Sequence, residues 1–74
     1  MIIRVHCLVP PEGPVAAPDR LELPSGATAG DAADTLHVPP EAIGTLLRND
    51  VPVERNAPLA HDDRLTIIPP ISGG

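Results

Sequence analysis

Apolar and polar residues alternate over the first nine positions of the chain, and many of the apolar ones are β-branched, which is typical of a β-strand. Successive side chains of a strand point to opposite faces, so residues 2–9 divide into two sets. One set is apolar throughout and is expected to face the core: Ile3, Val5, Cys7 and Val9. The opposite set is Ile2, Arg4, His6 and Leu8.

A second strand is predicted over residues 19–23, with Leu21 and Leu23 facing inward and Arg20 and Glu22 facing outward. A loop of proline, glycine and alanine separates it from the first strand. Two neighbouring strands joined in this way predict an antiparallel hairpin.

A short helix is predicted to follow. Thr28 and Asp31 have the spacing of a capping box, in which a hydroxyl and a carboxylate bind free backbone N–H groups. Apolar residues then recur at the helical spacing: Ala29, Ala32, Ala33 and Leu36. Pro39 and Pro40 end the helix. Because it spans only about nine residues, it needs packing against a sheet to be stable.

Three further strands are predicted over residues 43–48, 51–53 and 64–68. Asn49-Asp50 supply a turn between the first two of them, and Leu59 is expected to fill the core from the loop before the last strand. The predicted order is therefore β-β-α-β-β-β, and the last strand is free to pair beside the first.

This order predicts an α+β protein with the β-grasp fold, in which one short helix crosses a small mixed sheet. We expect the β-grasp domain to cover residues 1–68 and an extended flexible tail to cover residues 69–74. A chain of 74 residues has room for one small domain. It contains no aromatic residue, so Ile, Leu, Val and Ala must form the core.

Charge and composition exclude several classes of function. A net charge of -5 argues against a nucleic-acid binder, which needs a basic surface. One cysteine, Cys7, cannot form a disulfide framework or a four-cysteine metal site, and it is expected to be a small core residue. Three scattered histidines lack metal-ligand spacing, so no metal is expected. No apolar run approaches the ~18 residues of a membrane span. We expect a cytoplasmic protein that contacts neither membrane nor nucleic acid.

The last six residues, Pro69-Pro70-Ile71-Ser72-Gly73-Gly74, are the most informative of the chain. The two prolines favour an extended, stiff start of the tail. Gly73 and Gly74 have no side chains, so they fit a narrow channel and leave a terminal carboxylate uncovered. A carboxylate is a poor electrophile until another enzyme activates it, for example as an acyl-adenylate. The alternatives are a frayed chain end and a chain that continues past Gly74 until a protease exposes the tail.

These features resemble the ubiquitin-like sulfur carriers, namely the small subunit of molybdopterin synthase and the carrier of thiamine synthesis. The resemblance covers nearly the whole chain, and its specific part is Ile67-Ile68 followed by the tail. The Pro-Pro pair is similar to the molybdopterin branch. Two turns depart from the family pattern: Asn49-Asp50 replaces Asn-Gly, and His61-Asp62-Asp63 replaces Asp-Gly-Asp. In each, Asp stands where glycine suits a positive φ, at some cost in local geometry.

The resemblance implies a carrier cycle, in which the chain is not an enzyme alone. An adenylating enzyme similar to the ubiquitin-activating enzymes uses ATP on Gly74, and sulfur then converts the adenylate to a thiocarboxylate. The tail, Pro69, Pro70, Ile71, Ser72 and Gly73, threads into the large subunit of molybdopterin synthase, in a heterotetramer, and Gly74 donates sulfur. The carrier itself binds no cofactor.

A docking surface for such partners is expected where outward positions are apolar, at Leu8, Leu46 and Ile68. The alternative is that loops or the helix cover these side chains. Acidic residues around the surface predict a basic partner. Asp62 and Asp63 are otherwise expected to form a solvated turn.

Other functions remain open at this stage. The same carrier chemistry could supply thiamine or another sulfur metabolite, or the chain could be a protein modifier joined to a lysine amine of a target. A plain β-grasp interaction module is the fourth possibility. Deleting Gly73 and Gly74 separates the module, which keeps its function, from all the others.

Overall fold

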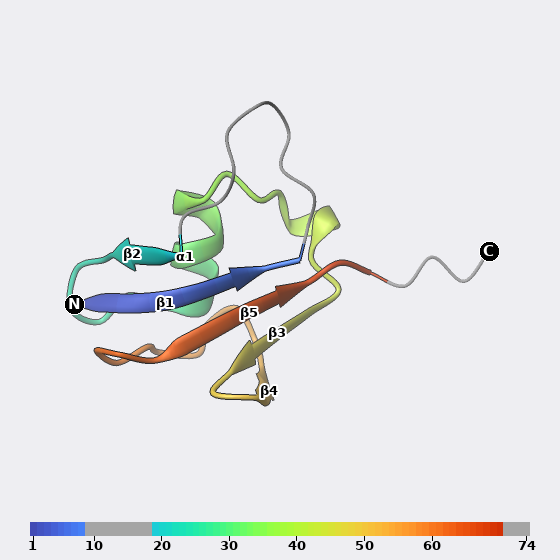
Figure 1. The fold of residues 1–74 in the computed structure, drawn as a ribbon. Coiled ribbons are helices and arrows are strands. Elements are labelled where there is room, and N and C mark those ends of the chain that lie inside the picture. The colour runs from blue at the N-terminus through green and yellow to red at the C-terminus, as the bar shows by residue number, and fades with distance from the viewer. Residues whose placement is uncertain (9–18, 71–74) are drawn as a thin grey trace.

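The first and last strands of the chain lie side by side and parallel in a five-stranded sheet with the order β2-β1-β5-β3-β4 (Figure 1). The structure is a computed structural model and describes residues 1–8 and 19–70. All other neighbouring strands are antiparallel. The strands are β1 Ile2–Cys7, β2 Arg20–Glu22, β3 Thr45–Arg48, β4 Val51–Val53 and β5 Arg64–Ile68. The predicted β-grasp fold is thus confirmed.

The helix α1, Ala29–Thr35, begins as predicted. The Thr28 N–H donates to Asp31 Oδ2 at 2.9 Å, and the Asp31 N–H donates to Thr28 Oγ1 at 3.2 Å. The next free N–H groups, those of Ala29 and Gly30, donate to carbonyls of the segment after β4 at 2.9 and 2.7 Å. Small residues on the buried side let the helix lie close to the sheet.

The core lies between α1 and one face of the sheet. Its largest fully buried side chains are Ile3, Leu65 and Ile67. Leu59 is 6% exposed, so the prediction that it fills the core is confirmed. We call the other face of the sheet, which α1 does not cover, the open face (Figure 1).

The strands predicted over residues 2–9, 19–23 and 43–48 are shorter in the structure, and the second of them, β2, covers only Arg20–Glu22. β1 ends at Cys7, and the position expected for Val9 lies outside the described residues. β3 begins at Thr45 and not at residue 43, because a 3-10 helix, η1 (Pro40–Ala42), precedes it. The Ile43 N–H closes that helix by donating to the Pro40 carbonyl at 3.1 Å.

Four residues other than glycine have a positive φ, and all of them end or turn an element among the described residues. Asn49 and Asp50, at 52° and 69°, join β3 to β4 in a two-residue hairpin, where both positions require this conformation. Asp62, at 68°, precedes β5, and His37, at 60°, follows α1. Both aspartates that replace family glycines therefore do adopt the conformation that favours glycine.

His37 occupies the position after α1 where glycine is commonest. Its N–H donates to the Asp34 carbonyl at 3.1 Å, and the Val38 N–H donates to the Ala33 carbonyl at 3.0 Å. These two bonds are those of a Schellman motif, which requires the left-handed conformation at His37.

We predict that His37→Gly stabilises the protein by about 1 kcal/mol, because glycine adopts a positive φ without a Cβ clash. Urea unfolding at neutral pH measures the change. His37→Ala is the matched control, since it removes the imidazole and keeps the Cβ, and it should give no gain. Equal gains in the two variants would contradict the backbone explanation.

Candidate functional site

The tail leaves the sheet beside Gly44, at the end of β5. The Gly44 N–H donates to the Ile68 carbonyl at 2.7 Å. A Cβ at position 44 would lie 2.5 Å from Pro70 Cα and 2.7 Å from the Pro69 carbonyl oxygen. Glycine is therefore required here for Pro69-Pro70 to take this path. The predicted site residues Ile71, Ser72, Gly73 and Gly74 lie outside the described residues.

Leu46, predicted to face outward, is only 3% exposed and belongs to the core. It is paired with the fully buried Ile67, and its prediction as a docking residue is wrong. β3 contains two successive leucines, so the alternation of apolar residues does not tell which of them faces the core. The half-buried Leu47 takes the outward position, opposite Thr66 of β5.

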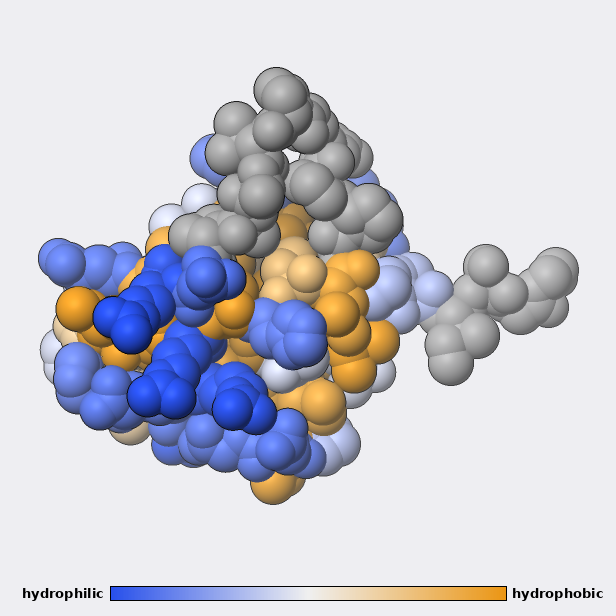
Figure 2. Space-filling model, viewed as in Figure 1, coloured by the Kyte–Doolittle hydropathy of each residue, from blue (hydrophilic) through white to orange (hydrophobic). Residues whose placement is uncertain are grey.

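Leu8 and Ile68 lie on the open face, as predicted. Leu8 is 49% exposed, Ile68 is half-buried, and the Leu8 N–H donates to the Ile67 carbonyl at 2.8 Å, which continues the pairing of β1 with β5. With Leu47 on β3, they form what we call the apolar patch. Figure 2 shows hydrophobic side chains near the end of the sheet from which the chain leaves β5. The helix does not cover this patch, because α1 packs against the opposite face.

Asp63 is not part of a solvated turn, and that prediction is wrong for it. It is 6% exposed, and its carboxylate accepts hydrogen bonds from Arg48 Nε at 2.6 Å, Asn49 Nδ2 at 3.0 Å and the Ala60 N–H at 2.7 Å. The prediction holds for Asp62, whose side chain is 73% exposed.

The same network lowers the pKa of Asp63. Burial by itself raises the pKa of a carboxyl group, but here the hydrogen bonds from Ala60, Arg48 and Asn49 and the charge of Arg48 outweigh it. The backbone joins the network too: the Arg4 N–H donates to the Asp63 carbonyl at 2.8 Å, and the Arg64 N–H donates to Asn49 Oδ1 at 3.0 Å. No sequence motif signals this cluster, because its members come from three segments.

The cysteine, a possible metal site and a possible membrane span were also considered from the sequence. Cys7 is half-buried and packs against the core. Within residues 1–8 and 19–70, no three His, Cys, Asp or Glu side chains are grouped so that they could hold a metal ion. No helix in this part of the chain has the length and apolar character needed to cross a membrane.

A mixed five-stranded sheet, a single crossing helix and a chain end that leaves the last strand beside the open face define a ubiquitin-like domain. The ThiS family model matches residues 13–74. The chain therefore belongs to the ThiS family of ubiquitin-like sulfur carriers. Among solved structures, the crystal structure of SAMP1 from Haloferax volcanii is similar over 100% of both chains, with 24% identity and a TM-score of 0.69. No curated protein matches the sequence.

We predict that Asp63→Asn lowers the free energy of unfolding by about 3 kcal/mol at pH 7, because it leaves the Arg48 charge unpaired beside a poorer acceptor. The folded pKa of Asp63 is lowered, so its stabilisation is complete above the unfolded pKa of 3.8 and is lost as the pH falls through the folded value. The loss caused by the mutation should therefore shrink in acid. Urea unfolding across this pH range measures it.

Asp62→Asn is the control for this experiment, because it makes the same chemical change on the exposed neighbour. It should leave stability nearly unchanged at every pH. A similar loss in both variants, or a loss for Asp63→Asn that does not depend on pH, would contradict the proposed role of the buried carboxylate.

Gly44→Ala should displace the base of the tail, since its Cβ cannot occupy the position 2.5 Å from Pro70 Cα. We expect NMR contacts between residue 44 and Pro70 to be lost, and the unfolding free energy to fall by about 1–2 kcal/mol. Thr45→Ala, at the next exposed position, is the control. Contacts that persist in Gly44→Ala would show that the sheet accommodates the methyl group without moving the tail.

Proposed function

We propose that this protein is a sulfur carrier for molybdopterin synthesis, acting as the small subunit of a molybdopterin synthase through its Gly74 carboxyl group. The observation that carries the proposal is the match to the ThiS family, which extends to Gly74. The path of Pro69-Pro70 past Gly44 supports it, because this path directs the chain away from the end of β5. The Pro-Pro pair favours the molybdopterin branch over the thiamine branch.

The chemistry takes place in three steps. In an adenylating enzyme, an oxygen of the Gly74 carboxylate attacks the α-phosphorus of ATP, and pyrophosphate leaves. A persulfide sulfur then attacks the resulting carbonyl carbon and displaces AMP. When a second thiol cleaves the sulfur–sulfur bond, a thiocarboxylate remains on Gly74. The fold holds the tail so that the thiocarboxylate can reach a partner's active site, and the partners supply the acid and base groups.

The partners of this cycle are the adenylating enzyme, which consumes ATP, and the large synthase subunit, in a heterotetramer. The tail residues Pro69 to Gly73 enter each partner in turn, and the body of the domain docks beside them. Leu8, Leu47 and Ile68 are the apolar side chains available for docking, because they lie on the open face on the side where the tail begins.

The proposal predicts that the full chain supports ATP-dependent pyrophosphate release when mixed with its adenylating enzyme. A variant lacking Gly73 and Gly74 should lose this activity completely, since its terminal carboxylate, now on Ser72, ends two residues short of the bound ATP. Circular dichroism provides the control that the shortened chain folds. Pyrophosphate release that is equal in both chains would contradict the proposal.

The molecule that accepts the sulfur is tested in a separate experiment. Transfer of sulfur from the thiocarboxylate to a pterin precursor in the presence of the large synthase subunit is the expected result. Transfer to a thiamine precursor would instead support the other carrier branch. Covalent adducts on cellular proteins that resist thiols would support a protein modifier. The sequence contains no lysine, so such a modifier could be attached once but could not form chains through internal side chains.

A further inference from the structure

Three arginines form a row across the open face, at the end opposite the tail. Arg4 of β1 is paired with Arg20 of β2 on one side and with Arg64 of β5 on the other. Paired residues on neighbouring strands, about 4.8 Å apart, point to the same face. All three arginines are exposed. Among the described residues, no carboxylate forms an ion pair with any of them. We call them the arginine row.

The stability of the isolated chain does not account for this arrangement. Like charges placed directly opposite one another on neighbouring strands are destabilising. The protein has only five cationic residues, with a net charge of -5, yet three of the five stand together. The remaining two, Arg48 and Arg55, each form an ion pair with an aspartate.

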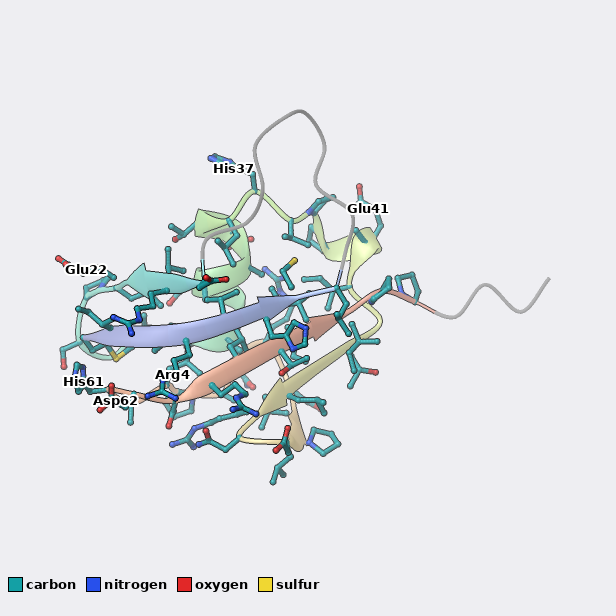
Figure 3. The ribbon with its side chains drawn as sticks, viewed as in Figure 1. Arg4, Glu22, His37, Glu41, His61 and Asp62 are labelled. Atoms are coloured by element: carbon teal, nitrogen blue, oxygen red, sulfur yellow. The ribbon has the colours of Figure 1, made fainter. Side chains whose placement is uncertain are left out.

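Acidic groups lie around the row without pairing with it. Asp50 and Asp62 line a hollow of about 280 Å³ together with Arg4, Arg64 and Asn49. Asp62 lies within 3.6 Å of His61 Nε2, and Glu22 lies farther along β2. Figure 3 shows Arg4, His61 and Asp62 at the same end of the sheet. These carboxylates moderate the positive potential, but they leave the guanidinium donors of the row available.

We propose that the arginine row is the charged half of a docking surface, and that the partner places a strip of carboxylates against it. The inference rests on the proposed function, since the partner in question is the adenylating enzyme that receives the tail. A guanidinium group can bind a carboxylate through two parallel hydrogen bonds, which makes arginine well suited to such recognition.

The apolar patch gives the other half of the same surface. Arg4 and Leu8 are four residues apart along β1 and its continuation, which corresponds to about 13 Å. One partner can therefore contact both. Figure 2 shows hydrophilic side chains over one end of this face and hydrophobic ones over the other. The partner surface should therefore be acidic at one end and apolar beside the tail. An acidic partner differs from the basic partner that we expected from the acidic residues around the docking surface.

Steady-state pyrophosphate release by the adenylating enzyme tests the proposal. In the triple variant Arg4→Gln, Arg20→Gln and Arg64→Gln, KM should rise about tenfold and depend less on salt, because charged contacts govern encounter and register. The value of kcat should stay the same, since the tail is intact. Arg55→Gln is the matched control: it removes one positive charge from an exposed ion pair with Asp34, away from the row.

An unchanged KM and salt dependence in the triple variant would overturn the proposal, and so would an equal effect of Arg55→Gln. The midpoint of thermal unfolding provides an independent reading. It should stay the same or rise when the row is neutralised, whereas a fall would indicate that the row acts in folding.

A second measurement separates this inference from the proposed function. If the wild-type chain supports no pyrophosphate release, the carrier proposal fails, and the row is tested by NMR titration of the full chain with a short polyglutamate peptide. Amide shifts confined to Arg4, Arg20 and Arg64 and absent from the triple variant would support an acidic partner. No shift, or tighter binding of a single-stranded oligonucleotide than of the peptide, would overturn it.

Discussion

Asp63, through its buried carboxylate and its backbone carbonyl, joins three parts of the chain: the end of β3 with its hairpin turn, the turn before β5, and β1. It binds Arg48 at the end of β3, Asn49 in the hairpin turn and the Ala60 N–H at the start of its own turn. The Asp63 carbonyl accepts the N–H of Arg4 in β1. The carboxylate therefore fixes how β5 enters between β1 and β3, and the pairing of the whole sheet follows from that register.

The opposite end of β5 depends on this register. If β5 were shifted by one residue, Leu65 and Ile67 would leave the core and the Ile68 carbonyl would no longer meet the Gly44 N–H. The position and direction of the tail base are thus set by a network at the far end of the strand. This separation leaves the end near the tail available to the partner that we propose.

Much of the fold could be predicted from the sequence, because each prediction depended on a local pattern. The capping box at Thr28 and Asp31, the alternation in β1 and β5 and the turn at Asn49-Asp50 are signals within a few residues. They determine which elements form and in what order. The path of the tail past Gly44 has no local signal, since it depends on how β3 meets β5.

The two wrong predictions, for Leu46 and Asp63, arose because contacts between distant segments decide which side chains are buried. Leu46 and Leu47 are adjacent and equally apolar, so only the pairing with β5 decides which of them is buried. Asp62 and Asp63 are chemically identical, and only the positions of Arg48 and Asn49 decide that one is buried and the other exposed. The arginine row likewise appears only when three strands are placed side by side.

The mass of the intact protein isolated from its native cells shows whether the Gly74 carboxyl group carries sulfur, as we propose. We expect a fraction of molecules whose mass has increased by the replacement of one oxygen with sulfur, located at Gly74 by fragmentation. An unmodified Gly74 in all molecules, also after incubation with the adenylating enzyme, ATP and a sulfur donor, would contradict it.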